Sequence, residues 1–453
     1  MLFFNSIARV YHSLVSPPTI PKKQDDAIRI GLLGASTIAP FAVITPAKSH
    51  PEVIVAAIAA RDIKRAHAYA QKYNIPIVHS SYQGKPLSIL LIGFLIANLP
   101  SQALLDDPSI DVVYIALPNS HHFEWSLRSL QAGKHVLLEK PCCSNATEAR
   151  RLFNHPLLTS PNSPVLLEAF HYQFHPAWQI FLTQVHQYPG SIQSASSQFY
   201  LPWLVLGKDD IRFKYSLGGG CLMDIATYCV SSVRQIVGRQ TKLSPTEVNY
   251  RPDSSFLGQS DTEPQIDKAM SAKFLTPSSQ SIQIQGDSAF TGWPSFLPYS
   301  WRNILPTFPW PKSEAVFEPV LVDTMVQEDG VPLQHFSRRT ITIWNHIFPF
   351  IYHRIDISDL HTLRRGDDIV KSWNDIRYEK AYNWPKDDKR AVVYRDWWST
   401  YRCQLEEFVN RIKDREGSGV WIDREESILQ METIDETYES AGLKPRATRE
   451  FEI

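Results

Sequence analysis

The feature that most constrains the fold is a regular alternation of apolar runs and helical segments between residues 28 and 138. Four runs have the length and composition of buried strands: Ile28 to Leu33, Val53 to Ala60, Val112 to Ala116 and His135 to Leu138. Helical segments are expected between them: Ile38 to Ser49, Ile63 to Tyr73 and His122 to Ala132. Strands that alternate with helices of this length form βαβ units and a parallel sheet. The pattern predicts an open, doubly wound sheet whose ligand lies outside the carboxyl ends of the strands.

The first expected strand runs into a turn with the sequence GLLGASTIAP. A glycine at such a turn lets backbone N–H groups approach a pyrophosphate at the positive end of a helix. The match to the GxGxxA pattern is imperfect, because Ser36 stands where the second glycine is expected. A simple tight turn therefore stays open as an alternative. As a cofactor site, the turn would contribute Gly34, Ser36, Thr37 and Ile38.

The second expected strand ends at a basic residue, Arg61, where an acid would otherwise hold a ribose 2′-hydroxyl. An arginine at this position suits a 2′-phosphate, so NADP is favoured over NAD. The alternative is a solvated arginine that opens the next helix.

The fourth expected strand runs directly into Glu139, Lys140 and Pro141. Lys140 would project from the carboxyl edge of the sheet, where the nicotinamide end of a dinucleotide is expected. In such a cleft, a lysine can lose its charge or stabilise an anion. The Lys140-Pro141 bond is a candidate for the cis form. Without further context, these residues also fit a surface turn.

A second group of residues follows three glycines, Gly218 to Gly220, which allow close backbone approach. The segment after them reads as one helix. Asp224 and Tyr228 are four residues apart, so they would share a face near its start. Taken alone, the pair fits a helix-start charge and a half-buried aromatic better than a catalytic pair.

These residues together resemble a known family. The sequence AGKHVLLEKP, preceded by DVVYIALPNSHHFEWSLRSL and by the glycine turn, is similar to the glucose-fructose oxidoreductase, inositol dehydrogenase and rhizopine-catabolism family, Gfo/Idh/MocA. The resemblance covers residues 28 to about 240, and 396–445 resembles the closing helices of the family. Dimeric dihydrodiol dehydrogenases and NADP-dependent D-xylose 1-dehydrogenases are the most similar subgroup. The resemblance implies a Rossmann domain followed by an α/β domain with an open, mainly antiparallel sheet that supports a homodimer.

The resemblance also implies roles for individual residues. The family places its general acid/base at the position of Tyr228, as tyrosine in the dihydrodiol dehydrogenase subgroup. Lys140 would favour the phenolate, and Asp224 would orient the lysine or a substrate hydroxyl. Gln173 replaces the arginine usual in the subgroup, which puts an anion-pairing role there in doubt. His122 would face the cofactor, with capping or packing as the alternative. Further cofactor contacts are implied for Pro118, Asn119, Glu139 and Lys140.

We therefore predict an NADP-dependent oxidoreductase of a cyclic sugar or a vicinal diol, of the D-xylose 1-dehydrogenase or trans-1,2-dihydrodiol dehydrogenase type. The alternative is a regulatory protein of the same fold that binds the dinucleotide without turnover. Fold analogy does not select the substrate.

Composition excludes some classes of partner. The 46 Lys and Arg residues nearly balance 47 Asp and Glu, so no net field favours nucleic acid or an anionic membrane. The five cysteines show no metal-ligand spacing and no disulfide framework, which favours a reducing compartment such as the cytoplasm. The N-terminus is a poor secretory signal, but it carries Arg9 and no acid before Asp25, so a mitochondrial presequence stays open.

The expected organisation is an N-terminal tail (1–27), an NADP-binding domain (28–160) and a substrate and dimerisation domain (161–453), whose last helices could pack back on the first domain. Residues 84–102, which we call the suspect segment, interrupt a connection that should be short. They break the family resemblance abruptly, so we interpret them as a translated intron, with a genuine membrane-surface or dimer-contact insertion as the alternative. Residues 289–400 are rich in Trp, Tyr and Pro and receive no chemical role.

Overall fold

The structure is a computed structural model, and it describes residues 2–80, 103–160, 163–207, 209–252, 266–291, 309–326 and 331–451. The suspect segment lies outside the described residues. The chain divides into two compact units. Unit 1 consists of Met1–Phe174, Asp396–Ile428 and Ala447–Ile453, and unit 2 of His175–Arg395 and Leu429–Arg446.

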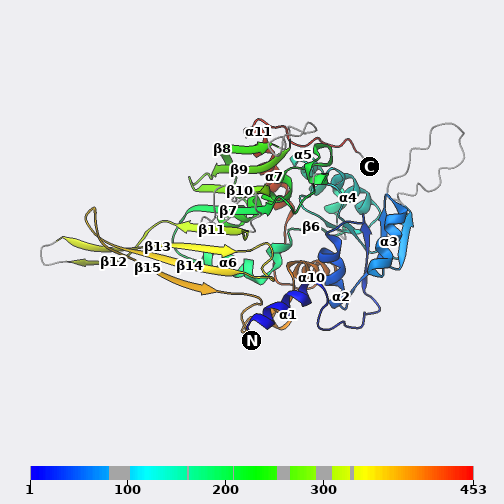
Figure 1. The fold of residues 1–453 in the computed structure, drawn as a ribbon, viewed down its shortest axis with the longest axis horizontal. Helices are drawn as coiled ribbons and strands as arrows, with labels where there is room; N and C mark the ends of the chain where they lie inside the picture. The colour runs from blue at the N-terminus through cyan, green and yellow to red at the C-terminus, as the bar shows by residue number, and fades with distance from the viewer. Residues whose placement is uncertain are drawn as a thin grey trace, which may run out of the picture. The chain divides into compact units, whose positions relative to one another are not determined.

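Unit 1 is built on a six-stranded parallel sheet with the strand order β3-β2-β1-β4-β5-β6 (Figure 1). The strands are β1 (Ile28–Leu33), β2 (Val53–Ala60), β3 (Ile77–Ser80), β4 (Val112–Ile115), β5 (His135–Leu138) and β6 (Leu166–Glu168). The chain moves outward from β1 to β3 and then returns to β4 on the other side of β1. The topological switch point therefore lies between the carboxyl ends of β1 and β4. The predicted doubly wound parallel sheet is confirmed.

Local signals explain where the helices of unit 1 begin and end. The Asp62 carboxylate accepts the N–H groups of Lys64 and Arg65 and starts α3 (Ile63–Tyr73). Asn74, with φ +57°, ends the same helix. α4 (His122–Gln131) follows β4, and Asn145 caps α5 (Ala146–Phe153).

The connection between β1 and β2 differs from the single helix expected over 38–49. It contains a π-turn, η1 (Pro40–Ile44), followed by the short α2 (Thr45–Ser49). The Thr45 N–H donates to the Pro40 carbonyl, five residues back. Pro46 has no N–H, so it cannot make the next α-helical bond, and the ladder is interrupted at this point.

Two segments distant in sequence complete unit 1. α10 (Thr400–Ile412) packs against α2 and against η4 (His171–Phe174), and the Thr400 hydroxyl is 2.8 Å from His171 Nδ1. Just beyond this helix, Lys413 and Arg415 each lie 2.8 Å from the Glu52 carboxylate. The expected N-terminal tail contains a helix, α1 (Leu2–Leu14), which contacts α2.

Unit 2 is built on a nine-stranded sheet with the order β15-β14-β13-β11-β7-β10-β9-β8, and β12 pairs with β13. β7 and β10 are parallel, and the other strand pairs that the structure describes are antiparallel. The strands are β7 (Ile192–Pro202), β8 (Ser244–Pro252), β9 (Asp267–Leu275), β10 (Ser281–Phe290), β11 (Lys312–Phe317), β12 (Val320–Val326), β13 (Pro332–Trp344), β14 (Arg354–Arg365) and β15 (Asp368–Glu379). The predicted second, mainly antiparallel sheet is confirmed.

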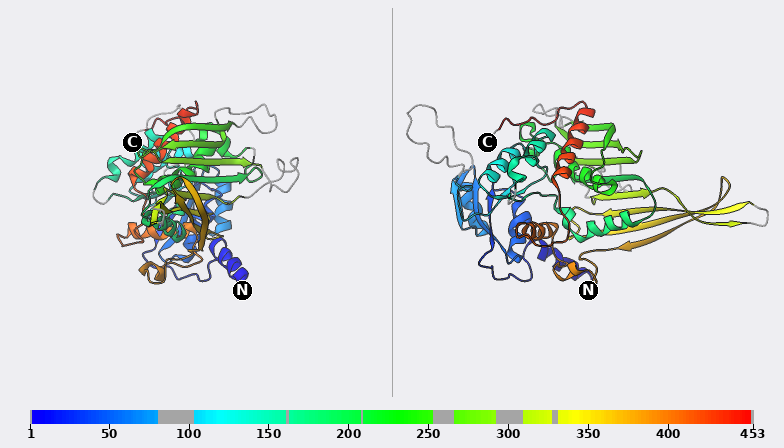
Figure 2. Two further views of the ribbon diagram at one scale, coloured as in Figure 1. Left: turned by 90° about the vertical axis from the view of Figure 1, so that its left-hand side faces the viewer. Right: turned by 180° about the vertical axis from the view of Figure 1, so that it is seen from behind.

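Helices cover one face of this sheet, as the right-hand view of Figure 2 shows. α8 (Ala226–Val237) packs on β7 and β10, and α6 (Pro176–Gln187) packs on β13. The contact between α8 and β10 is close, because a Cβ on Gly286 would lie 2.6 Å from the Ala226 Cβ. α11 (Arg424–Ser440) contributes its residues from Leu429 onward to unit 2.

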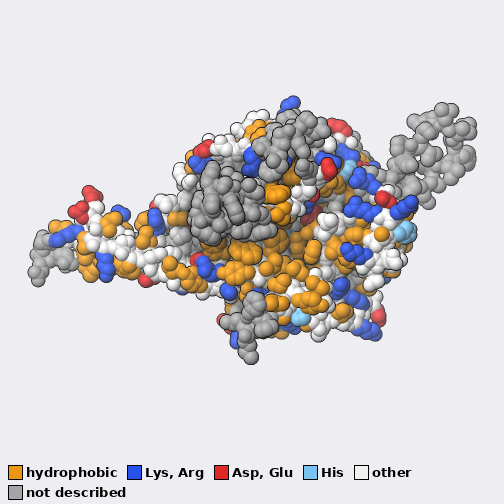
Figure 3. Space-filling view, viewed as in Figure 1, with side chains coloured by type: hydrophobic (Ala, Val, Ile, Leu, Met, Phe, Trp, Pro, Cys, Tyr) orange, Lys and Arg blue, Asp and Glu red, His pale blue; other side chains and the backbone are white. Residues whose placement is uncertain are grey.

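The strands β12 to β15 extend beyond the other strands of unit 2 as a long antiparallel arm (Figure 1). Every residue of β12 is exposed. Apolar side chains lie on the surface of the arm (Figure 3). The exposed apolar residues of β12 and β15 include Leu321, Val322, Met325, Val326, Ile369, Val370, Ile376 and Tyr378. Much of the region 289–400, which received no chemical role, thus forms strands β11 to β15.

Candidate functional site

The glycine turn after β1 has a backbone that only glycine adopts easily. Gly34 has φ +96°, and a Cβ there would lie 3.1 Å from a Leu117 methyl group. Two side chains of α3 donate hydrogen bonds to the backbone carbonyls of the two residues after Gly34. Arg65 Nη2 donates to the Ala35 carbonyl at 2.8 Å, and the Tyr69 hydroxyl donates to the Ser36 carbonyl at 2.9 Å.

The N–H groups of the same turn are left for another acceptor. Those of Ala35, Thr37 and Ile38 donate to no acceptor in the part of the chain that the structure describes. The Ser36 hydroxyl oxygen accepts the Ala39 N–H at 3.2 Å, so this serine caps the start of the following turn. Backbone donors directed away from their own carbonyls suit an anionic ligand such as a pyrophosphate.

Arg61 lies at the carboxyl end of β2, directly before the cap of α3, and its side chain is exposed. It forms no hydrogen bond or ion pair with the described residues. Its charge nevertheless reaches the turn after β4, because it contributes to the lowered pKa of His121.

The turn after β4 is a 3-10 turn, η2 (Asn119–His121), which Pro118 precedes. His122 is fully buried behind it, with Nε2 2.9 Å from the Leu117 carbonyl and Nδ1 2.8 Å from the Pro141 carbonyl. Burial lowers the pKa of His122 to about 4, although both carbonyls oppose this shift. His122 therefore joins the turn to the Lys140-Pro141 segment. This geometry agrees with the packing alternative, because both ring nitrogens face carbonyl oxygens of the chain.

Lys140 follows β5, and the bond to Pro141 is cis, as the sequence suggested. The side chain is half-buried. Its positive charge contributes to the lowered pKa values of two buried histidines, His122 and His171, after burial itself. The Glu139 carboxylate is buried and accepts the Tyr114 hydroxyl at 2.7 Å, so it fixes the end of β5 against β4.

A buried carboxyl, Glu168, holds the segment after Lys140 from the neighbouring strand. Glu168 ends β6 and accepts the Cys142 N–H at 2.8 Å. Burial raises the pKa of Glu168 to about 7, and the charge of Glu426 adds to the rise. Gln173 is buried in the same region and donates to Glu426 at 2.9 Å, which explains how an amide can occupy this position.

The second group of predicted residues lies in unit 2. The three glycines do allow close approach: a Cβ on Gly219 would lie 2.5 Å from the Arg212 carbonyl oxygen. A Cβ on Gly220 would clash with the buried Arg446 and Asp267, which form an ion pair at 3.0 Å. The glycines therefore serve the packing of unit 2.

The single helix expected to carry Asp224 and Tyr228 is wrong. Asp224 ends the short α7 (Cys221–Asp224), and Tyr228 lies in α8, which begins after a break at Ile225. The buried Asp267 accepts the Leu222 N–H at 2.7 Å and fixes α7 to β9, whereas α8 follows the sheet at β10. These two attachments orient α7 and α8 in different directions, so the helix is broken at Ile225.

Within unit 2, Asp224 pairs with a residue that sequence reasoning missed. Arg212 Nε lies 2.8 Å from Asp224 Oδ2, and Asp210 holds the same guanidinium at 3.0 Å. Tyr228 is 6% exposed, and its ring contacts Phe199 edge-on, with ring centroids 6.0 Å apart.

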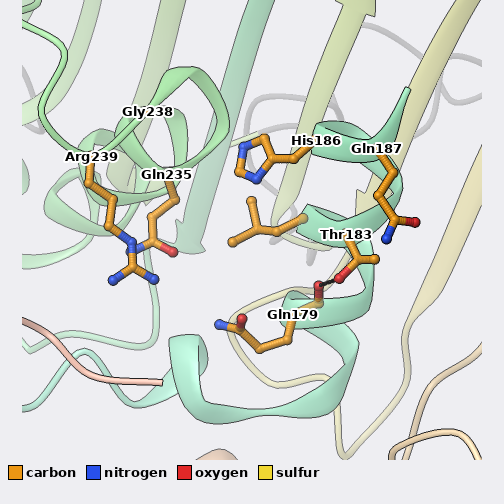
Figure 4. Close-up of a pocket in the computed structure, with 8 residues that line it drawn as sticks. Gln179, Thr183, His186, Gln187, Gln235, Gly238 and Arg239 are labelled. Atoms are coloured by element: carbon orange, nitrogen blue, oxygen red, sulfur yellow. Dashed lines mark hydrogen bonds between the residues drawn. The ribbon is translucent and has the colours of Figure 1, made fainter. Parts of the chain in front are cut away.

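A separate pocket of about 400 Å³ lies on unit 2 between α6 and the end of α8, where Thr183 and His186 face Gln235 and Arg239 (Figure 4). It is lined by none of the predicted site residues. His175 and Trp178 are completely buried and pack in unit 2. The described residues include no group of three or more His, Cys, Asp or Glu side chains arranged to hold a metal ion.

Residues 28–156 match the model of an oxidoreductase family with an NAD-binding Rossmann fold, GFO_IDH_MocA. D-xylose 1-dehydrogenase (NADP(+)) 2 of Haloferax volcanii is 33% identical over 258 residues, which are 56% of this chain and 72% of that protein. The chain belongs to the Gfo/Idh/MocA oxidoreductase family. The family predicted from the sequence is thus confirmed.

Other relatives of this Gfo/Idh/MocA protein agree. Trans-1,2-dihydrobenzene-1,2-diol dehydrogenase of Xenopus laevis is 31% identical over 202 residues, 44% of this chain and 53% of that protein. The chain therefore spans about half the length of that relative.

Solved structures share the fold of this Gfo/Idh/MocA protein. A 3-ketoreductase from Actinomadura kijaniata, in complex with NADP and TDP-benzene, has a TM-score of 0.59 at 20% identity and covers 91% of this chain and 98% of its own. An aldose-aldose oxidoreductase from Caulobacter crescentus has a TM-score of 0.61 at 15% identity, over 92% and 98% of the two chains. At these identities the likeness concerns the fold alone.

The structure of this Gfo/Idh/MocA protein brings the predicted cofactor residues together at one edge of the unit 1 sheet: Gly34, Ser36, Thr37, Ile38, Arg61, Pro118, Asn119, His122, Glu139 and Lys140. Asp224 and Tyr228 lie in unit 2. Sequence reasoning missed the side chains that hold the turns. Arg65 and Tyr69 could have been found from their four-residue spacing on the helix after Arg61, but no local signal identifies Arg212.

Proposed function

We propose that this chain is an NADP-dependent dehydrogenase that moves hydride between nicotinamide and a hydroxyl carbon of a cyclic sugar or vicinal diol. One observation carries the proposal. Gly34, Arg61 and Lys140 follow β1, β2 and β5 at the carboxyl edge of a single parallel sheet whose switch point lies between β1 and β4. Dinucleotides bind at this edge in doubly wound folds.

The residues present suit a dinucleotide. The N–H groups of Ala35, Thr37 and Ile38, which have no acceptor among the described residues, would hold the pyrophosphate. Arg61, exposed at the end of β2, would bind the 2′-phosphate, because it stands where an acid would otherwise bind a ribose hydroxyl, and the neighbouring Asp62 carboxylate caps α3. The Haloferax volcanii relative is named for NADP(+), and the Actinomadura kijaniata 3-ketoreductase was crystallised with NADP. Both support NADP over NAD.

The reaction divides between cofactor and protein. When bound, NADP supplies the hydride acceptor. The protein must remove the substrate hydroxyl proton, and we assign this step to the Tyr228 hydroxyl. A tyrosine with the ordinary pKa of about 10 is a poor base at neutral pH, and a positive charge favours its phenolate. We assign that charge to Lys140. Asp224, oriented by Arg212 at 2.8 Å, would accept a substrate hydroxyl.

The substrate is tested with a panel of aldoses and vicinal diols, with NADPH formation as the readout. The proposal expects turnover of at least one cyclic aldose or vicinal diol. NADP binding without turnover of any member would instead favour the rival, a dinucleotide-binding regulatory protein. The presence of Asp224 and Tyr228 together with Lys140 in the sequence supports the enzyme, because neither Asp224 nor Tyr228 is assigned to cofactor binding.

We further propose that the protein is a cytoplasmic homodimer that uses the sheet of unit 2. The apolar side chains exposed on β12 and β15, the two outer strands of the arm, support this, because exposed apolar surface favours association. The five cysteines are free and buried, which is compatible with a reducing compartment. No helix among the described residues is long and apolar enough to cross a membrane. Sedimentation of the purified chain tests the dimer, and a monomer at micromolar concentration would contradict it.

A further inference from the structure

Residues 447–451, close to the end of the sequence, belong to unit 1 and run beside α4 and α5 (Figure 1). Three hydrogen bonds fasten it to α5 and its cap: Asn145 Nδ2 to Thr448 Oγ1 at 3.0 Å, the Arg449 N–H to Glu148 Oε1 at 2.6 Å, and Arg151 Nη2 to the Phe451 carbonyl at 2.8 Å. The Arg128 guanidinium also lies 4.6 Å from the centre of the Phe451 ring. This segment, which we call the terminal strap, is therefore a fixed part of unit 1.

One side chain of the terminal strap contacts the turn after β4. Arg449 Nη1 donates to the Ser120 carbonyl at 3.2 Å and to His121 Nδ1, and it forms an ion pair with Glu124 at 3.2 Å. Ser120 and His121 lie in η2, and Glu124 lies in the first turn of α4. Arg449 thus joins η2 to the helix that follows it.

The contact also determines the state of the His121 ring. A guanidinium can only donate, so His121 Nδ1 must carry the lone pair and the ring proton must lie on Nε2. Burial lowers the pKa of His121 to about 4, and the charges of Arg449, His122 and Arg61 add to this. His121 is therefore neutral at pH 7. In the sheet, β2 and β4 are the two neighbours of β1, so η2 and the end of β2 follow the strands on either side of the glycine turn.

The turn is consequently held from two directions. His122 attaches it to the Leu117 and Pro141 carbonyls inside unit 1, and Arg449 attaches it through Ser120 and His121. The turn follows β4 at the switch point, so its conformation shapes the edge of the sheet at which the cofactor is proposed to bind.

We propose that Arg449 is a positioning residue for the cofactor, which holds η2 in the conformation that receives the adenosine half of NADP. This inference rests on the proposed function, because it takes the end of β2 as the site of the 2′-phosphate. The competing explanation is that the strap only fastens α4 and α5. That role is shared by Arg151, which anchors Phe451 but forms no hydrogen bond or ion pair with η2 among the described residues.

The experiment measures binding rather than activity alone. Isothermal titration with NADP, with 2′,5′-ADP and with nicotinamide mononucleotide is compared for the unmodified chain, Arg449→Ala, Arg449→Lys and the control Arg151→Ala. We expect Arg449→Ala to weaken NADP and 2′,5′-ADP about tenfold, the loss typical of hydrogen bonds from a charged group. Binding of nicotinamide mononucleotide and kcat at saturating NADP should stay unchanged. Arg449→Lys should recover part of the loss, because an ammonium can still donate to one of the two acceptors.

The possible results distinguish the positioning role of Arg449 from the proposed function of the protein. Unchanged NADP affinity in Arg449→Ala, or an equal loss in Arg151→Ala, would overturn the positioning role and leave the proposed function intact. Failure of the unmodified chain to bind NADP would overturn both. If Arg449→Ala does not fold, Arg449→Gln replaces it, since an amide can still donate to the Ser120 carbonyl without the charge.

Discussion

Replacement of Glu168 by glutamine should remove a pH dependence from the folding stability of unit 1. Burial raises the pKa of Glu168 from the ordinary 4.5 to about 7. Between these two pH values the folded protein keeps a proton that the unfolded chain has lost. Stability from this group is therefore fully present below pH 4.5 and is lost as the pH rises through 7. A shift of this size corresponds to about 3 kcal/mol, at about 1.4 kcal/mol for each pH unit.

Glutamine keeps the shape of the side chain and can still accept the Cys142 N–H, but it does not titrate. Urea unfolding, followed by tryptophan fluorescence at pH 5, 6, 7 and 8, measures the difference in unfolding free energy between Glu168→Gln and the unmodified chain. This difference should move by about 3 kcal/mol in favour of the variant as the pH rises. The use of a difference cancels the titrating groups that do not interact with Glu168. The matched control is Glu439→Gln, at an exposed position of α11, which should give a flat line.

The prediction is contradicted if the difference in unfolding free energy between Glu168→Gln and the unmodified chain changes by less than about 0.5 kcal/mol over these pH values. A change of that size is the scatter seen for surface substitutions. Such a result would mean that Glu168 is ionised in the folded protein at low pH, with its charge compensated by the surrounding N–H and hydroxyl donors.

Three further predictions concern function and sequence. Arg61→Ala should reduce the preference for NADP over NAD, expected at about tenfold or about 1.4 kcal/mol, to near unity in equilibrium titrations; equal affinities in the unmodified protein would refute it. Tyr228→Phe should lower kcat by roughly 10² to 10⁴ with NADP affinity unchanged, and Lys140→Met should lower kcat at least as much. Near-normal turnover in either variant would mean that another residue has the role proposed for the replaced one. Peptide mass spectrometry of the native protein should find Gln83 joined directly to Ala103, whereas tryptic fragments from within the suspect segment would disprove the intron.

Four of the six strands of unit 1 could be predicted from sequence because their signals are local, whereas β3 and β6 were not expected. β1, β2 and β5 have the expected bounds, since each is a short apolar run that ends at a glycine or a charged residue. The helix expected over 38–49 is present over 40–49, but its first half, Pro40–Ile44, is π-helical and only Thr45–Ser49 is α-helical. The missing N–H of Pro46 could have indicated this irregularity from the sequence.

The candidate site was less predictable because its positioning contacts are not local. The break at Ile225 depends on Asp267 and on the close packing of Ala226 against Gly286, both far along the chain. Arg449 reaches a turn more than three hundred residues away in sequence. No periodicity or motif in the sequence indicates a contact between residues so far apart. Sequence reasoning could therefore name the residues of a family motif but not the side chains that hold them.

The division of unit 1 among three stretches of chain has a consequence for biosynthesis. When Phe174 leaves the ribosome, the partner of His171 on α10 and the terminal strap have not yet been made. At about 5–20 residues per second, the remaining chain takes roughly 15–60 s to synthesise, and the first unit stays incomplete for that time. Until then, the surface that α10 covers in the folded unit stays exposed, and such incomplete species are prone to aggregate. A fragment that ends at residue 174 should be aggregation-prone, and attempts to express the nucleotide-binding half alone need the distant segments joined to it.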